Sequence, residues 1–234
     1  MKGTATLPFL AAAILGSANP VPSQGNDPTP ITSWTKAFIL IANVTDPSRD
    51  LSPSVNNLML TGVHVGAGME TAVLSADTGR VLYENGTDHE VGVGADTGAV
   101  YPYSVDLAPL PSEIPESTYV EYIGIDAGTT HPGVTISPPI VLWPRLLGPE
   151  TGTFVVCNES RPAYGRPQYP VRFAKVQEVN GVMYQHIPDR CAAIALLPQC
   201  AALGALPPGA QYNHNFVRAV RCFNNVASIN WKEH

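Results

Sequence analysis

Two Asp-Thr-Gly triplets, which start at Asp77 and Asp96, are the residues of this chain most typical of catalysis. In aspartic proteases two such carboxylates share one proton between two lobes. Here the two aspartates are only 19 residues apart, too close to belong to separate lobes. Arg80 and Ala99 also follow the triplets, where those enzymes have Ser or Thr. We therefore interpret both triplets as turns, and we expect residues 76–79 to form a hairpin between two strands.

A second candidate for chemistry is the Tyr184-Gln185-His186 run, which is similar to the Tyr-x-His of small fungal ribonucleases. His214 and Arg218 follow it, but the only acid after Asp189 is Glu233, at the extreme C-terminus. A general base opposite the general acid is therefore lacking. The six histidines show no metal-binding spacing, and no G-x-S-x-G motif is present. We expect no catalytic residue, no metal and no cofactor.

Four cysteines in the C-terminal third predict two disulfide bonds, provided that the chain is exported. A strand over residues 191–197 would carry the chain about 20 Å from Cys191, at roughly 3.3 Å per residue. The next three residues are too few to bring Cys200 back to the roughly 4.4–6.8 Å that separates bridged Cα atoms. This leaves two of the three possible pairings open. We favour Cys157–Cys191, which would join two strands that can lie side by side, with Cys200–Cys222, which would tie a helix to the preceding loop. Zinc is disfavoured because no C-x-x-C spacing occurs.

The N-terminus has the features of a signal peptide. Lys2 precedes an apolar run, and Gly16 and Ala18 supply the small residues that a signal peptidase requires. We predict a signal peptide over residues 1–18, a proline-rich disordered leader over 19–31, and a single β-rich domain over 32–234. The protein is then secreted and extracellular.

Three Asn-x-Ser/Thr triplets agree with this export. They begin at Asn43, Asn85 and Asn158, each close to a predicted strand end or turn. We predict that these asparagines are glycosylated.

The composition of the chain limits the classes of molecule that it can bind. Charged residues make up 14% of the chain and its formal net charge is −6, against an average charged fraction of about 25%. An acidic protein without a basic run gains nothing from the phosphates of nucleic acids and is repelled by anionic lipids. After the signal peptide, no segment approaches the roughly 20 apolar residues of a membrane span. We expect neither nucleic acid nor a membrane as a partner.

Short apolar segments separated by Gly, Pro, Asn and Asp indicate an all-β fold, a two-sheet, sandwich-like domain. Two segments, 38–41 and 192–197, are apolar on both faces, which places them centrally. Helical spacing over residues 214–223, behind a cap at Asn213 or Asn215, predicts one short C-terminal helix. Residues 108–117 are a predicted loop. The predicted strands are 35–44, 58–65, 72–75, 81–84, 91–93, 119–126, 134–137, 154–158, 171–176 and 191–197.

One segment has the composition of a contact surface. Residues 161–169 join two predicted strands and contain Arg161, Tyr164, Arg166 and Tyr169, stiffened by prolines. Tyr and Arg are enriched in binding surfaces. The alternative is a rigid connection whose tyrosines pack on the sheet.

Several runs resemble a family of small secreted fungal proteins that carry a domain of unknown function. The resemblance covers roughly residues 34–231 and implies a secreted fungal protein with an all-β core. It assigns no catalytic residue. The runs that carry it are Phe38-Ile39-Leu40, residues 51–57, Gly66-Ala67-Gly68, residues 82–87, residues 153–159, residues 164–171 and Leu197-Pro198-Gln199-Cys200.

Three functions stay open on the sequence. The favoured one is a secreted, non-enzymatic glycoprotein that acts at the fungal cell wall or a host-facing surface, where the partner would be a wall polysaccharide or a host surface component. The second is a carbohydrate-binding or small-ligand-binding module that uses the 161–169 loop. The third is a secreted hydrolase whose site has no recognised motif.

Overall fold

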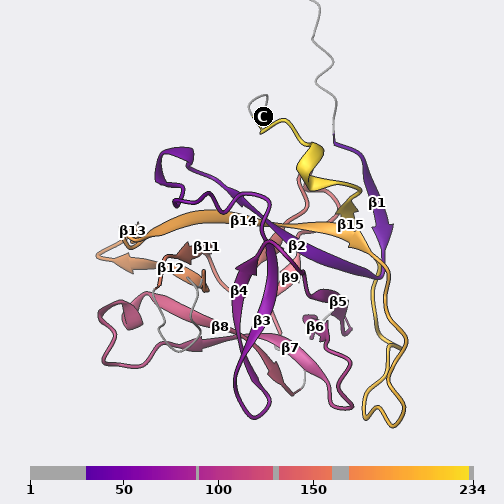
Figure 1. The fold of residues 1–234 in the computed structure, drawn as a ribbon. Coiled ribbons are helices and arrows are strands. Elements are labelled where there is room, and N and C mark those ends of the chain that lie inside the picture. The colour runs from indigo at the N-terminus through magenta and orange to yellow at the C-terminus, as the bar shows by residue number, and fades with distance from the viewer. Residues whose placement is uncertain (1–29, 88–89, 129–131, 160–168, 232–234) are drawn as a thin grey trace, which may run out of the picture.

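The structure, a computed structural model, describes residues 30–87, 90–128, 132–159 and 169–231 (Figure 1). The predicted signal peptide and most of the predicted leader lie outside these residues. The fold is all-β, as the sequence predicts, with a 13-stranded sheet and a two-stranded sheet. Among the described residues, no helix has the length and apolar character needed to cross a membrane.

The strands of the large sheet are β1 (Thr32–Thr35), β2 (Ala37–Val44), β3 (Met59–Gly66), β4 (Met69–Ser75), β5 (Val81–Asn85), β6 (Gly92–Asp96), β7 (Tyr103–Pro109), β8 (Val120–Ala127), β11 (Gly152–Cys157), β12 (Val171–Val179), β13 (Val182–Gln185), β14 (Cys191–Ala201) and β15 (Val220–Phe223). The small sheet contains β9 (Thr135–Ile136) and β10 (Leu146–Leu147). Short 3-10 turns are η1 (Pro47–Arg49), η2 (Pro115–Thr118) and η4 (Val226–Ser228).

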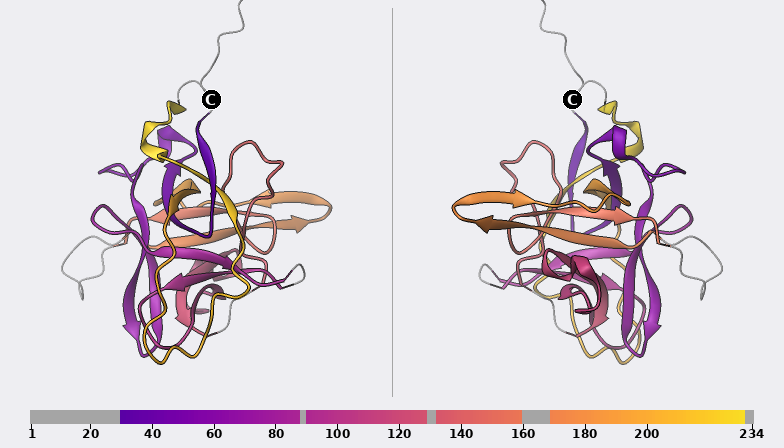
Figure 2. Two further views of the ribbon diagram at one scale, coloured as in Figure 1. Left: turned by 90° about the vertical axis from the view of Figure 1, so that its right-hand side faces the viewer. Right: turned by 90° about the vertical axis from the view of Figure 1, so that its left-hand side faces the viewer.

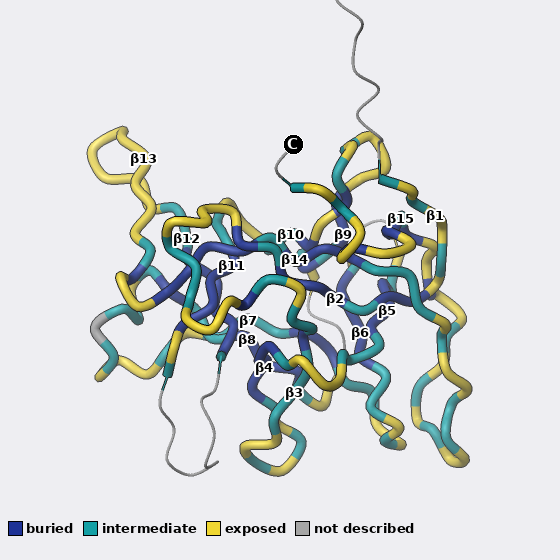
Figure 3. Tube along the Cα trace, turned by 45° about the horizontal axis from the view of Figure 1, so that its top comes forward, coloured by how far each residue is buried: buried dark blue, intermediate teal, exposed yellow. Residues whose placement is uncertain are grey.

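The large sheet curls back on itself. Its strand order is β1-β15-β14-β11-β12-β8-β4-β3-β2-β5-β6-β7, and two further pairings, β14 with β2 and β8 with β7, close the path. Opposite parts of the sheet therefore face each other across one apolar core, which is dark blue in Figure 3. Its largest buried side chains include Phe38, Leu40, Leu60, Leu82, Ile123, Ile125, Phe173 and Leu196.

Strands β2 and β14 are central, as their apolar faces predict. They pair antiparallel over eight positions, from Ile194 opposite Val44 to Ala201 opposite Ala37. Alternate side chains of each strand enter the main core, and Ile41 and Leu197 point to the other side. There they join a second apolar cluster with Phe223 and Val226. Burial on both faces thus accounts for the unbroken apolar sequence of these strands.

The helix predicted over residues 214–223 is wrong. The predicted cap does form, because the Asn213 side chain accepts from Asn215 N at 3.0 Å, but only one turn follows, with Val217 N donating to His214 O at 3.2 Å. The chain then becomes β15, which pairs with β1. Phe216, on the expected buried face, is 60% exposed. Sheet pairing therefore overrides a weak helical spacing, and the short C-terminal helix is reduced to the 3-10 turn η4.

The hairpin predicted at residues 76–79 is also wrong. β4 pairs with β3 and β8, whereas β5 pairs with β2 and β6, so this segment crosses between strands that are not neighbours. Strand β7 was not among the predicted strands, although Tyr103, Val105 and Leu107 alternate toward the core. β13 forms a hairpin with β12 that extends beyond the body of the molecule (Figure 2).

Candidate functional site

A cavity of about 350 Å³ lies on the outer face of the sheet formed by β4, β8, β12 and β11. Its floor contains Tyr122 of β8, Arg172 of β12 and Cys157 of β11. Val65 and Met69, from the β3–β4 hairpin, form part of the rim and are 39% and 49% exposed. The opposite wall is the connection from β7 to β8, with Pro109, Leu110, Pro111, Ile114 and Glu116.

Strand alternation places the floor residues outward. Ile123 and Ile125 of β8 and Val171 and Phe173 of β12 enter the main core. Their neighbours Tyr122 and Arg172 must therefore point to the opposite face. Beside them a small outer apolar cluster, built on Val120, Val155, Cys157, Ala174 and Cys191, gives the floor a packed base.

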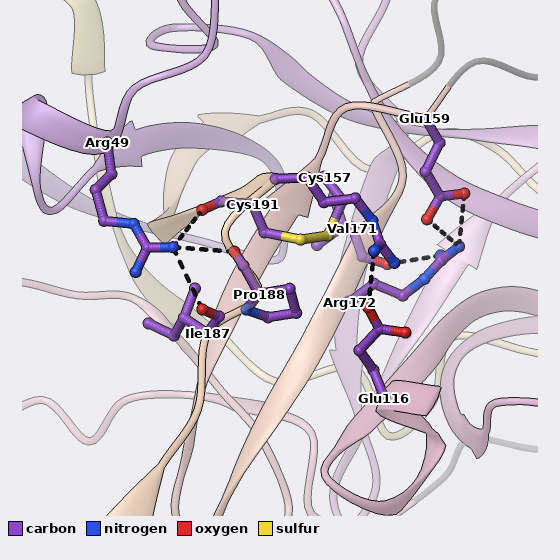
Figure 4. The surroundings of a disulfide bond; sticks show 10 residues. Arg49, Glu116, Cys157, Glu159, Val171, Arg172, Ile187, Pro188 and Cys191 are labelled. Carbon is purple, nitrogen blue, oxygen red and sulfur yellow. Dashed lines mark hydrogen bonds and ion pairs between the residues drawn. A yellow bond between two sulfur atoms is a disulfide. The ribbon is translucent and has the colours of Figure 1, made fainter. Parts of the chain in front are cut away.

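Arg172 is the buried charge of this site, with only 4% of its surface exposed. Its Nη2 donates to both carboxylate oxygens of Glu159, at 3.3 and 3.4 Å, and its Nη1 donates to the carbonyl of Val171 at 3.3 Å (Figure 4). The guanidinium carbon also lies 5.7 Å from the centroid of the Tyr122 ring. A buried guanidinium needs such partners, because an unpaired charge is costly to desolvate.

A second ion pair holds the wall of the cavity. Arg190 Nη1 lies 2.7 Å from Oε1 of Glu116, which belongs to the turn η2. Glu116 is labelled in Figure 4. The hydrogen bond from Arg190 lowers the pKa of the Glu116 carboxyl. This pair joins the β7–β8 connection to the segment that leads into β14, so it fixes the cavity wall in place.

Tyr122 and Asp126 are two further polar residues that line the cavity. The Tyr122 hydroxyl donates to the carbonyl of Glu70 at 2.9 Å, and Asp126 accepts from Glu70 N at 2.9 Å. Burial raises the pKa of the Asp126 carboxyl. These contacts bind β8 to β4, so the polar groups of the cavity hold the sheet together.

The residues that line the cavity are of types that suit the binding of a ligand. The described residues that line it include no histidine, serine or lysine, and its cysteine is in a disulfide. Its arginines are paired with carboxylates, and most of the remaining lining is aliphatic or proline. Among the described residues, no group of three or more His, Cys, Asp or Glu could hold a metal ion.

Both predicted disulfides are present. Cys157 and Cys191 lie directly opposite each other on β11 and β14, and their bond borders the cavity. Cys200 bonds Cys222. The expected context of this second bond is wrong, because it joins the neighbouring strands β14 and β15 and no helix is involved.

Most of the predicted contact segment lies outside the described residues, including Arg161, Tyr164 and Arg166. Tyr169 is described and half-buried: it packs against the main core, and its carbonyl accepts from Leu74 N at 3.0 Å. Glu159, which lines the cavity, precedes this segment in the chain. Arg172 was not among the predicted site residues, although an arginine directly between the apolar residues Val171 and Phe173 is a signal of a buried, paired charge.

The other predicted residues lie apart from the cavity. Asn158, after β11, is exposed, whereas Asn43 of β2 and Asn85 of β5 are half-buried. Asp77 is exposed in the β4–β5 connection and Asp96 ends β6. The ring of His186 packs edge-on against Tyr119, and that of His214 against Tyr83.

Fold and site together define a disulfide-linked, all-β protein with a ligand-sized cavity on the outer face of its sheet. The chain belongs to the family of the domain of unknown function DUF7907, whose model matches residues 35–200. It is similar to the antigenic protein SchS34 of the fungus Stachybotrys chartarum, with 35% identity over 226 residues, which covers 93% of this chain and 99% of that protein. No solved structure matches the chain significantly. The resemblance to a fungal family of unknown function is thereby confirmed.

Proposed function

We propose that this protein is a secreted, non-enzymatic glycoprotein of the fungal cell wall or host-facing surface, and that its cavity binds a small, mainly apolar molecule. The extracellular part of the proposal is supported by two disulfides, which persist in oxidising compartments. It is supported as well by the similarity to a fungal protein named as antigenic.

The observation that carries the binding proposal is the composition of the cavity. Its volume of about 350 Å³ falls within the range of small-molecule sites. Aliphatic and proline side chains form the rim and most of one wall, while the polar groups include Arg172 and Tyr122 on the floor and the Glu116–Arg190 ion pair at that wall. Such a site favours an apolar body with one polar end. Tyr122 is the sole aromatic side chain among the described lining residues, which makes a stacked sugar the weaker candidate.

A fluorescent fatty acid, cis-parinaric acid, tests this proposal on the purified full-length secreted chain. Its emission rises when it leaves water, so saturable binding gives a titration curve. The variant Met69→Glu places a charge on the exposed rim, and we expect it to weaken binding at least tenfold.

Met183→Glu is the matched control. Met183 is 59% exposed on β13 and does not line the cavity, so the same change there should leave binding unaltered. An unsaturable signal, or a loss caused by Met183→Glu and not by Met69→Glu, would overturn the assignment of the cavity as the site.

A further inference from the structure

A second hollow, of about 370 Å³, lies between the β1–β15 pair and the segment around β9. Trp34 stands at its edge and is 59% exposed. Pro138 and Pro139, both exposed, border the same hollow. An indole that remains so exposed in a folded domain offers a flat apolar surface for a ligand.

Arg221 is held rigidly beside this tryptophan. The two residues lie directly opposite each other in the β1–β15 pair, so their side chains share one face of the sheet. Arg221 Nε donates to Thr32 Oγ1, and its Nη1 donates to the carbonyls of Pro139 and Val141, each at 3.1 Å. Among the described residues, no hydrogen bond occupies its Nη2 amino group, which is left for a ligand.

The charged side chains of the hollow differ in their partners. Among the described residues, those that line it are Arg218, Arg221 and Glu84. Glu84 is 7% exposed and already accepts a hydrogen bond from Ile136 N at 2.9 Å, while its other oxygen lies 3.8 Å from Arg218 Nε. Arg221, by contrast, donates to one hydroxyl and two carbonyls in the described part of the chain, so no described carboxylate matches its charge, which favours an anionic ligand.

We propose that this hollow binds an acidic saccharide, with a pyranose ring stacked on Trp34 and a uronate carboxylate directed to Arg221. The C–H face of a pyranose matches a flat indole, and guanidinium groups are the side chains best suited to carboxylates. This site is separate from the cavity beside the Cys157–Cys191 disulfide, and it does not depend on the ligand proposed there.

Tryptophan fluorescence of the full-length protein tests the proposal at low salt, with trigalacturonate as the probe and neutral galactotriose as the comparison. The chain has three tryptophans. Trp143 and Trp231 pack together with ring centroids 5.4 Å apart, away from the hollow, so a ligand there changes the emission of Trp34. We expect saturable quenching by trigalacturonate and at least tenfold weaker binding of galactotriose.

Variants distinguish the site from a general surface effect. By calorimetry, Trp34→Ala should lower trigalacturonate affinity at least tenfold, and Arg221→Gln should lower it severalfold. Trp231→Phe should change neither the affinity nor the quenching. Because Trp34 is exposed, its variant should keep the melting temperature of the wild type, which confirms that the fold is retained. Absence of binding, equal binding of the neutral trisaccharide, or full affinity in Trp34→Ala would overturn the proposal.

Discussion

The guanidinium of Arg49 donates to the carbonyl of Cys191, with a separation of 3.3 Å between Nη2 and the oxygen (Figure 4). The same Nη2 also donates to the carbonyls of Ile187 and Pro188, at 3.3 and 2.9 Å. Arg49 ends the turn η1, far from β14 in sequence. One side chain thus anchors the backbone at which β14 begins and at which the disulfide beside the cavity is attached.

We predict that Arg49→Lys destabilises the protein by about 1–2 kcal/mol, because the lysine side chain is shorter and its ammonium does not reach the position from which Nη2 contacts the three carbonyls. Urea unfolding measures the loss. Arg145→Lys is the control, since Arg145 is exposed and the change there should stay within about 0.5 kcal/mol. Equal stability of the two variants would show that the Arg49 contacts contribute nothing.

The fold was predictable where local pattern and global packing agree. β2 and β14 are apolar on both faces, and the structure buries both faces. β15 was not predictable, because residues 220–223 carry a helical spacing and become a strand only through pairing with β1, nearly 190 residues earlier. A single sequence contains no signal for such long-range pairing. For the same reason the 76–79 segment was assigned to a hairpin, although β4 and β5 have other partners.

The cavity was out of reach of sequence analysis for a related reason. Its floor combines side chains of β8, β11 and β12, and its rim comes from the β3–β4 hairpin. Apart from Arg172, none of these residues stands out in its own segment. Strand length excludes a bond between Cys191 and Cys200, which both belong to β14, and leaves two pairings. The observed pairing was favoured because Cys157 and Cys191 lie on two strands that can be neighbours, as β11 and β14 are.

Removal of the Cys157–Cys191 disulfide should destabilise the protein by roughly 3–4 kcal/mol in the chain-entropy model. The bond closes a loop with a sequence separation of 34, and Cys200–Cys222 closes one of 22, so the two losses should be similar. Denaturant unfolding of the double variants Cys157→Ala/Cys191→Ala and Cys200→Ala/Cys222→Ala measures both. Melting of the first variant within a degree or two of wild type would contradict its structural role.

The buried carboxyl of Glu84 should make the free energy of unfolding depend on pH. Burial raises the pKa of its carboxyl above the ordinary value of 4.5, although the Ile136 N–H and Arg218 act in the opposite direction. Because the folded pKa lies above the unfolded one, this contribution is full below about pH 4.5 and is lost as pH rises through the raised folded value. Glu84→Gln keeps an oxygen for Ile136 N and removes the titration.

We therefore expect that the melting temperature of Glu84→Gln, relative to wild type, increases between pH 4 and pH 7. Calorimetry across this range gives the difference at each pH, which cancels the titration of groups common to both proteins. Asp77→Asn serves as the control, because Asp77 is exposed in the β4–β5 connection. A difference between Glu84→Gln and wild type that does not change with pH would refute the assignment.

The last prediction concerns the mature N-terminus and the glycosylation of the secreted chain. The mature chain should begin at Asn19, because the apolar run and the small residues Gly16 and Ala18 define a cleavage site. Of the three acceptor asparagines, Asn158 should carry the most glycan, since it is exposed immediately after β11. At Asn85, by contrast, the amide oxygen is buried and has no hydrogen-bond partner among the described residues. N-terminal sequencing of the culture supernatant, with peptide mapping before and after deglycosylation, measures both features. An intact Met1 would refute the signal peptide, and an unmodified Asn158 beside an occupied Asn85 would show that exposure in the folded chain does not govern glycosylation here.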